Sequence, residues 1–299
     1  MAKPLTNIGS RPDAYGPAEW GLSLTVGVIW GSAFLWIAIG VDFLSPGVVA
    51  LGRVVFGAAA LAAFPRARRL IERADWGRIL AVAVAGNALP ALLFAQAETE
   101  LDSAVAGMIT SGTPILALAI ASLLLWKLPG RPQVIGISLG FVGIVLMALP
   151  SLTGTEASPM GITLVLVATV GYGLTSNLIV PLQQKYGGPA VIMWALVVSS
   201  VLLLPMGLLG IGASEFNPRA VLAVLILGIV GTGIARALAA TLAGRVGGPR
   251  MTTTTYLVPI VAIVLGVVFR GESVAPIALV GVATVLAGAY WATRAVPSA

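Results

Sequence analysis

Ten runs of apolar residues, each about 20 residues long, follow one another along this chain of 299 residues. A helix rises about 1.5 Å per residue, so each run is long enough to cross a hydrocarbon layer about 30 Å thick. Short clusters of Gly, Pro and charged residues separate the runs and supply the turns between them. The expected spans are residues 18–41, 46–64, 76–97, 103–125, 132–150, 160–183, 188–209, 218–243, 250–269 and 274–293.

The composition excludes a soluble protein. Charged residues make up only 9% of the chain, whereas soluble domains carry about 25%. The sequence therefore predicts an all-α polytopic membrane protein. The chain has no Cys and no His, which removes thiolate and imidazole ligands, so we expect no metal and no cofactor. The basic residues stand singly between spans, so we expect membrane lipid, and no nucleic acid, around this protein.

The basic residues also predict an orientation, because Lys and Arg resist translocation and stay in the cytoplasm. With the N-terminus inside, 13 of the 17 basic residues fall in inner segments, and the outer loops hold only Arg219 and Arg270. We therefore expect both termini in the cytoplasm and a multi-pass protein of the inner (plasma) membrane. Residues 1–17 are predicted as a disordered cytoplasmic lead and residues 294–299 as a tail.

A shift of 145 residues aligns the second part of the chain with the first. It places Pro114 on Pro259, and the same shift pairs Ala117 with Ala262, Gly136 with Gly281 and Gly143 with Gly288. We interpret residues 18–150 and 160–293 as two copies of a five-helix unit, joined by a linker at 151–159. Five spans is an odd number, so the second copy is inverted in the membrane, as in many secondary transporters. Chance similarity among Gly- and Pro-rich helices is the alternative.

Two local patterns carry a family resemblance. An early aromatic–Gly pair opens each half, in "WGSAF" (30–34) and "YGLTS" (172–176), and a polar-x-x-P-x-x-A pattern lies on the fourth helix of each half. With ten spans in two halves, residues 18–293 resemble the EamA family of the drug/metabolite transporter superfamily, and most of all YddG-type aromatic amino acid exporters. Such families often carry an acidic residue after the fourth helix of each half. Here only Glu272 is present, and the resemblance implies a structural role for it.

The two prolines mark the first candidate site. Each proline removes a helix hydrogen bond and leaves a carbonyl one turn earlier, which must find a partner in neighbouring helices, water or substrate. We expect the faces that carry them to form opposite walls of a central cavity, although small and hydroxyl residues equally suit helix packing. The residues of these faces are Gly107, Thr110, Ser111 and Pro114 in the first half, and Thr252, Thr255, Tyr256 and Pro259 in the second.

Four further residues complete the predicted substrate site. Asn87 and Arg236 come from the third helix of each half, and Trp30 and Tyr172 come from the first. Arg236 lies several residues from either end of its span, where a charge is costly and usually faces a cavity. Arg236 either binds a substrate carboxylate or reaches the membrane interface. Trp30 either lines the substrate pocket or packs against neighbouring helices. We expect Arg53, in the second helix, to be structural.

The function that these features predict is transport. The spans hold no nucleophile with a base, so we expect no enzyme. We expect a secondary transporter that exports aromatic and other largely apolar amino acids, or related small metabolites, by alternating access. Without His, and with Glu98 expected in an acidic loop, coupling to ions is expected to be weak or absent. The alternatives are export of drug-like metabolites by proton antiport, and a gated pore. One monomer would contain both repeats.

Overall fold

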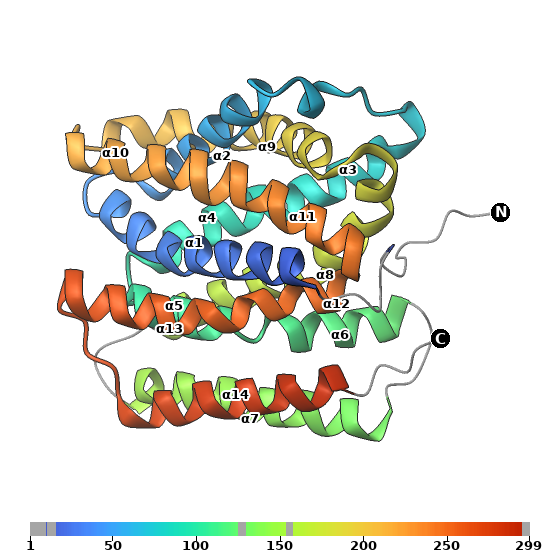
Figure 1. The fold of residues 1–299 in the computed structure, drawn as a ribbon. Coiled ribbons are helices and arrows are strands. Elements are labelled where there is room, and N and C mark those ends of the chain that lie inside the picture. The colour runs from blue at the N-terminus through green and yellow to red at the C-terminus, as the bar shows by residue number, and fades with distance from the viewer. Residues whose placement is uncertain (1–9, 11–15, 125–129, 154–157, 295–299) are drawn as a thin grey trace.

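The computed structural model describes residue 10 and residues 16–124, 130–153 and 158–294. Every regular element in these ranges is a helix, and the helices lie roughly side by side in one bundle (Figure 1). Most of the predicted lead, the tail beyond residue 294 and the centre of the predicted linker lie outside the described residues. At the edges of that linker, α7 continues to Thr153 and α8 begins at Pro159.

The helices are named as in Figure 1. In the first half of the chain they are α1 (Pro17–Val41), α2 (Pro46–Ala62), η1 (Pro65–Arg68), η2 (Arg73–Asp75), α3 (Trp76–Ala83), η3 (Val84–Ala88), α4 (Leu89–Ala97), α5 (Ser103–Thr110), α6 (Thr113–Leu124) and α7 (Arg131–Thr153). In the second half they are α8 (Pro159–Tyr186), α9 (Gly188–Gly210), η4 (Ile211–Ala213), α10 (Pro218–Ile226), η5 (Leu227–Ile234), α11 (Ala235–Val246), α12 (Gly248–Met251), η6 (Thr252–Leu257), α13 (Val258–Leu265), η7 (Gly266–Arg270) and α14 (Pro276–Arg294).

Among the described residues, seven helical segments are long and apolar enough to cross a membrane, and three apolar helices are shorter. The protein is therefore an all-helical polytopic membrane protein. The seven are Pro17–Val41, Arg73–Ala97, Ser103–Leu124, Pro159–Tyr186, Gly188–Ala213, Pro218–Val246 and Thr252–Arg270; the shorter ones are Pro46–Ala62, Val134–Met147 and Pro276–Gly288. The number of ten crossings and the cytoplasmic termini stay predictions.

Local sequence explains where several helices begin. Serine or asparagine followed by proline starts α2, α8 and α10. In α2 the Ser45 hydroxyl accepts a hydrogen bond from the Val48 amide, and in α10 the Asn217 side chain accepts one from the Arg219 amide. The proline follows at a position whose missing N–H would have no partner in the helix. Each such cluster between apolar runs therefore acts as a helix start.

The two hydroxyl–proline segments interrupt their helices, as expected. Pro114 cannot donate to the Thr110 carbonyl, and the Thr113 hydroxyl donates to it instead at 2.6 Å. In the second half, the chain adopts the tighter 3₁₀ geometry of η6, and the Val258 amide donates to the Thr255 carbonyl. Both irregularities are therefore satisfied within the protein rather than left open to lipid.

The third span of each half contains a wider, π-helical turn. These turns are η3 in the first half and η5 in the second. The shift of 145 residues places Val84–Ala88 within η5. π-Helical turns often occur at functional sites, because they displace side chains and free backbone groups. The two turns lie next to the cavity described below.

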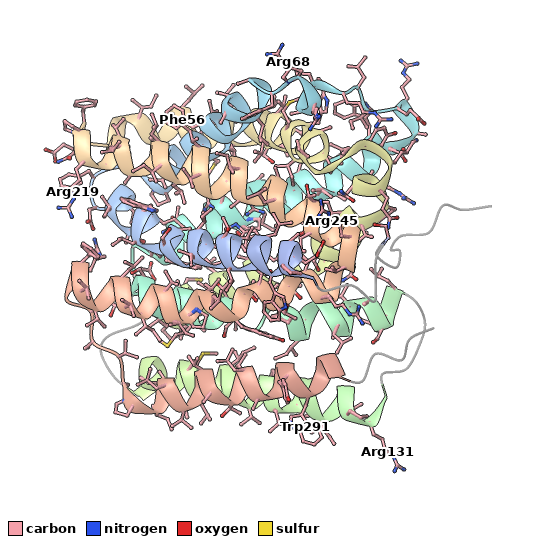
Figure 2. The ribbon with its side chains drawn as sticks, viewed as in Figure 1. Phe56, Arg68, Arg131, Arg219, Arg245 and Trp291 are labelled. Carbon is pink, nitrogen blue, oxygen red and sulfur yellow. The ribbon has the colours of Figure 1, made fainter. Side chains whose placement is uncertain are left out.

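Helices α7 and α14 form a pair along one side of the bundle (Figure 1). Their glycines allow the backbones to touch: a Cβ at Gly143 would lie 2.7 Å from the Gly281 carbonyl oxygen, and one at Gly288 would lie 2.6 Å from that of Gly136. The start of α1 and the end of α14 lie at the same end of the bundle (Figure 1). Arg131 projects at this end, and Arg219 projects at the opposite end (Figure 2).

Candidate functional site

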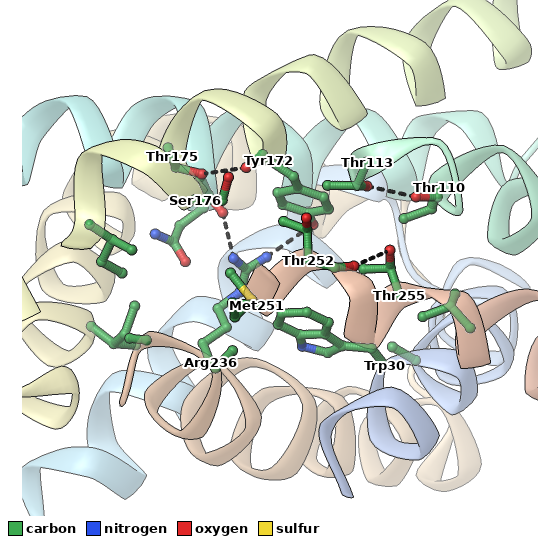
Figure 3. A pocket seen from close by; sticks show the side chains of 18 of the residues that line it. Trp30, Thr110, Thr113, Tyr172, Thr175, Ser176, Arg236, Met251, Thr252 and Thr255 are labelled. Atoms are coloured by element: carbon green, nitrogen blue, oxygen red, sulfur yellow. Dashed lines mark hydrogen bonds between the residues drawn. The ribbon is translucent and has the colours of Figure 1, made fainter. Parts of the chain in front are cut away.

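A cavity of about 100 Å³ lies in the middle of the bundle, between the two halves of the chain. Its wall is mostly apolar and aromatic, with hydroxyl groups and two arginines. Figure 3 shows hydroxyl side chains entering from separate helices, with Arg236 directed toward Tyr172. The lining residues are Trp30, Ala33, Phe34, Ile37, Arg53, Val82, Gly86, Asn87, Phe94, Thr110, Thr113, Tyr172, Thr175, Ser176, Ile179, Ile192, Arg236, Ala239, Ala240, Met251, Thr252, Thr255 and Val258. We call it the central cavity.

Seven of the twelve predicted site residues line the central cavity, and five do not. Those that line it come from both halves, as the repeat suggested. They are Trp30, Asn87, Thr110, Tyr172, Arg236, Thr252 and Thr255. The five that lie elsewhere are Gly107, Ser111, Pro114, Tyr256 and Pro259.

The five residues outside the lining pack helices together. Gly107 lies against Ala262 of α13, so its missing side chain permits a close helix contact. Ser111 is fully buried, and its hydroxyl donates to the Met108 carbonyl at 2.6 Å. Tyr256 packs on the hydrophobic cluster between α7 and α14, and its hydroxyl has no hydrogen-bond partner. Pro114 and Pro259 are buried and shape their helices. For these five residues, helix packing therefore describes the structure better than a cavity wall does.

Arg236 is fixed in the cavity by two hydrogen bonds. Its Nη1 donates to the Gly86 carbonyl at 2.6 Å, and its Nη2 donates to the Tyr172 hydroxyl at 2.9 Å. The guanidinium carbon lies 5.0 Å from the centre of the Tyr172 ring, a cation–π contact. The Gly86 carbonyl belongs to the π-helical turn η3. The irregular backbone therefore orients the arginine, while the Arg236 Nε has no partner.

Arg53 is a second cation in this cavity, which we had expected to be structural. It lies in the middle of α2, is only 4% exposed and belongs to the cavity lining. Its Nε donates to the Thr232 hydroxyl at 3.1 Å, but its Nη1 has no hydrogen-bond partner. The described lining residues include no Asp or Glu. The signal in the sequence was an arginine near the centre of an apolar run, the same signal that identified Arg236.

Other lining residues were not predicted. Thr113 rather than Ser111 faces the cavity, because the break after Thr110 rotates the next helix. Thr175 and Ser176 follow the Tyr172–Gly173 pair, within the "YGLTS" motif that the sequence already singled out. The residue type alone does not distinguish a Ser or Thr hydroxyl that faces the cavity from one that only donates to a carbonyl of the preceding helical turn.

Three aromatic rings in the lining of the central cavity pack on one another. Phe34 meets Phe94 edge to face at 5.5 Å between ring centres, and Phe94 stacks on Tyr172 at 5.7 Å. All three rings belong to the cavity lining, and they come from α1, α4 and α8. Such stacked and edge-to-face pairs stabilise the contact between these three helices.

Glu98 is the first residue after α4, at the start of the acidic loop "ETELDS" where we expected it. Its burial was not expected, since it is only 8% exposed. Neither of its carboxyl oxygens has a hydrogen-bond partner. It does not line the central cavity but a second one, near the ends of α1 and α4.

Comparison with known proteins identifies the family. The model of the EamA-like transporter family matches residues 20–149 and again residues 159–294. The chain belongs to the EamA-like transporter family. It is therefore a membrane transporter of small metabolites and not an enzyme. The two matches divide the chain at the same place as the predicted repeats.

Curated relatives match nearly the whole chain at low identity. A probable terminal-alkyne amino-acid exporter of Streptantibioticus cattleyicolor is 28% identical over 280 residues, covering 93% of each chain. A probable amino-acid metabolite efflux pump of Salmonella typhimurium is 24% identical over 297 residues, covering 94% of each. One solved crystal structure superposes with a TM-score of 0.69 at 18% identity, covering 93% of this chain and 96% of the other, which supports the fold alone.

Proposed function

We propose that this EamA transporter exports aromatic and other largely apolar amino acids, or closely related small metabolites, through the central cavity. The observation that carries the proposal is that Arg53 and Arg236 face one apolar cavity whose described lining contains no carboxylate. A guanidinium matches a carboxylate in geometry and binds it through two parallel hydrogen bonds. Donors on both arginines lack partners. A solute with a carboxylate would supply the missing negative charge.

The rest of the wall favours a small apolar body behind that carboxylate. The rings of Trp30, Phe34 and Phe94 and several aliphatic side chains line the cavity. Its volume of about 100 Å³ is well below the roughly 300–1,000 Å³ of sites for drug-sized ligands. This supports an amino acid over a drug, and two relatives named for amino-acid export agree with it. YddG-type specificity for aromatic amino acids belongs to this proposal.

Several features support alternating access by two inverted five-helix repeats, residues 18–150 and 160–293. Under the shift of 145 residues, the contact of Gly143 with Gly281 maps onto the contact of Gly288 with Gly136. A two-fold relation between the halves explains why both contacts exist. The two π-helical turns and the two hydroxyl–proline breaks correspond in the same way. One monomer would contain the complete path, in the inner membrane with both termini in the cytoplasm.

Coupling to an ion is proposed to be weak or absent. The described residues that line the central cavity include no carboxyl group that could exchange a proton with the solute. Export would then follow the concentration gradient of the solute. A proton antiporter of drug-like metabolites would instead need such a group in the path.

The test of the proposal is a panel of competitors in purified protein reconstituted in liposomes. Labelled phenylalanine uptake is measured while phenylalanine, its amide and phenethylamine compete for the site. We expect the two competitors without a carboxylate to inhibit about tenfold more weakly or worse. The reason is that each of them loses one or more charge-assisted hydrogen bonds to the arginines. Equal inhibition by all three would contradict a carboxylate site, and uptake that does not saturate would support the gated pore.

A further inference from the structure

A second cavity lies at the end of the bundle where α1 and α4 finish. Its volume is about 440 Å³, and its lining is mainly polar and acidic. We call it the acidic cavity; the predicted orientation places it on the outer side. It is lined by Ala38, Val41, Asp42, Glu98, Thr99, Glu100, Leu101, Asp102, Ser103, Arg270 and Glu272.

Two of its carboxylates are already neutralised. Arg270 donates to both oxygens of Asp42, at 2.8 and 3.1 Å, and its Nε lies 3.5 Å from Glu272. Glu272 also accepts bonds from the Ser103 amide at 3.1 Å, the Ser103 hydroxyl at 2.6 Å and the Ala104 amide at 2.9 Å. The only cation in the described lining of this cavity is therefore fully engaged.

Glu98 differs from these groups because it is buried without a partner. It is 8% exposed, and neither carboxyl oxygen has a hydrogen bond. An ionised carboxylate in such a place is strongly disfavoured, and the usual response is to take up a proton. Burial raises the pKa of Glu98 well above its usual range, and the nearby charge of Glu272 raises it further. Glu98 lies one residue beyond the predicted span Arg73–Ala97.

Other charged groups line the acidic cavity together with Glu98. Asp42 comes from the end of α1, Glu100 and Asp102 from the connection to α5, and Arg270 and Glu272 from the segment after α13. Arg53 of α2 acts on it from the direction of the central cavity. The two arginines and the nearby Ala38 amide favour the ionised form, but burial and the charge of Glu272 outweigh them.

The position of Glu98 connects it to the central cavity. It lies one helical turn beyond Phe94, on the same side of the helix, and its amide donates to the Phe94 carbonyl at 3.0 Å. Phe94 is the middle ring of the three packed aromatic rings in the lining of the central cavity. A movement of Phe94 that opened a path between these rings would therefore also move the end of α4, next to which Glu98 lies.

We propose that Glu98 is a proton-binding site that stabilises the closed form of this end of the transporter. The proton comes from the adjoining solution; Glu98 holds it while the acidic cavity is closed and returns it when the cavity opens to water. A metal ion is not the favoured ligand, because the described residues include no suitable group of three acidic, Cys or His ligands. The proposal rests on the proposed transport path but makes the proton a regulator rather than a driving ion.

The sign of the effect follows from linkage. The closed form binds the proton more tightly than the open form, in which a hydrated glutamate has a pKa of about 4.3. Between that value and the raised pKa of the closed form, each pH unit changes the ratio of closed to open molecules by up to about tenfold. Acid on the outer side therefore favours the closed form, and the closed form is lost as the pH rises.

The test uses the absence of cysteine from this chain. A single cysteine is introduced by Ala38→Cys, at a buried position that lines the acidic cavity, and its labelling by an impermeant maleimide is measured between about pH 5 and about pH 8. Thr99→Cys, at an exposed position in the turn that follows α4, corrects for the reactivity of the thiol itself. The corrected labelling rate is expected to rise severalfold with pH, and to become independent of pH when Glu98→Gln is added.

The outcomes separate this inference from the proposed function, because labelling needs no transported solute. A pH dependence that persists with Glu98→Gln, or that is absent from the parent protein, overturns the proton site. The control Glu100→Gln, at an exposed position two residues along the chain, is expected to keep the full pH dependence. Loss of the pH dependence with Glu100→Gln but not with Glu98→Gln would assign the proton to the surface loop and contradict the proposal.

Discussion

Arg236 of α11 and Tyr172 of α8 meet across the central cavity, where the arginine Nη2 donates to the tyrosine hydroxyl at 2.9 Å. The guanidinium also lies over the aromatic ring, with 5.0 Å from its carbon to the ring centre. The pair connects the first and third spans of the second half. It holds a cation in a defined position and leaves the Arg236 Nε without a partner.

The first prediction concerns Tyr172→Phe, which keeps the ring and removes the acceptor hydroxyl. Such a hydrogen bond contributes about 0.5–1.5 kcal/mol, and bonds to charged groups contribute up to about 3 kcal/mol. We expect the apparent affinity for a transported amino acid to fall by about threefold to tenfold, because the guanidinium becomes less well oriented. The concentration dependence of uptake measures it. Tyr256→Phe is the control, since that hydroxyl has no partner and lies outside the cavity lining.

The second prediction concerns Arg53, whose Nη1 has no partner. Arg53→Met is expected to reduce the affinity for amino acids more than tenfold, because the cavity loses a cation that a carboxylate would neutralise. Arg53→Lys is expected to lose less, since it retains the charge without the paired donors. Competition by phenylalanine measures both changes. Unchanged affinity in a folded Arg53→Met protein would return Arg53 to the structural role that the sequence first suggested.

The third prediction concerns the stability supplied by Glu272. This carboxylate caps the start of α5 from another part of the chain, through the Ser103 and Ala104 amides. Glu272→Gln is expected to lower the free energy of unfolding by about 1–3 kcal/mol, because charge-assisted bonds to the helix start are weakened. Thermal unfolding in detergent measures the change. Glu100→Gln, at an exposed site on the same side, is expected to leave the midpoint within about 1 °C.

The fourth prediction concerns the contact between α7 and α14. Gly281→Leu is expected to lower the yield and the unfolding temperature of the folded protein strongly, because a side chain there meets the Gly143 carbonyl and Met147. Val280→Leu places the same leucine side chain one residue earlier, where the native side chain is 53% exposed, and should be tolerated. Equal behaviour of the two variants would show that the glycine contact is dispensable.

Much of the fold was accessible from the sequence because membrane spans are long and the joints between them are distinct. The expected range 188–209 corresponds to Gly188–Gly210, and 46–64 corresponds to Pro46–Ala62. The π-helical turns η3 and η5 were not predicted, since no residue type marks them. They depend on how the third spans pack on their neighbours, which a single helix does not encode.

The site was predicted less completely, for a reason that Pro114 and Glu98 illustrate. Pro114 is the residue that draws attention in the sequence, yet its effect is to turn the next helix so that Thr113 enters the cavity. Glu98 stands within an acidic cluster, and only the three-dimensional structure shows that the end of α4 buries it. Side-chain direction at helix breaks and ends is set by tertiary contacts. Trp30 and Arg236, both predicted as site residues, line the central cavity.

The most direct test of the central claim is counterflow in proteoliposomes. Purified protein is reconstituted, the vesicles are loaded with an unlabelled amino acid, and uptake of labelled phenylalanine, tryptophan or threonine is followed without any ion gradient. The account predicts saturable uptake that the internal amino acid accelerates and that Arg53→Met reduces. Absence of uptake for every amino acid, from protein shown to be folded, would contradict amino-acid export through the central cavity.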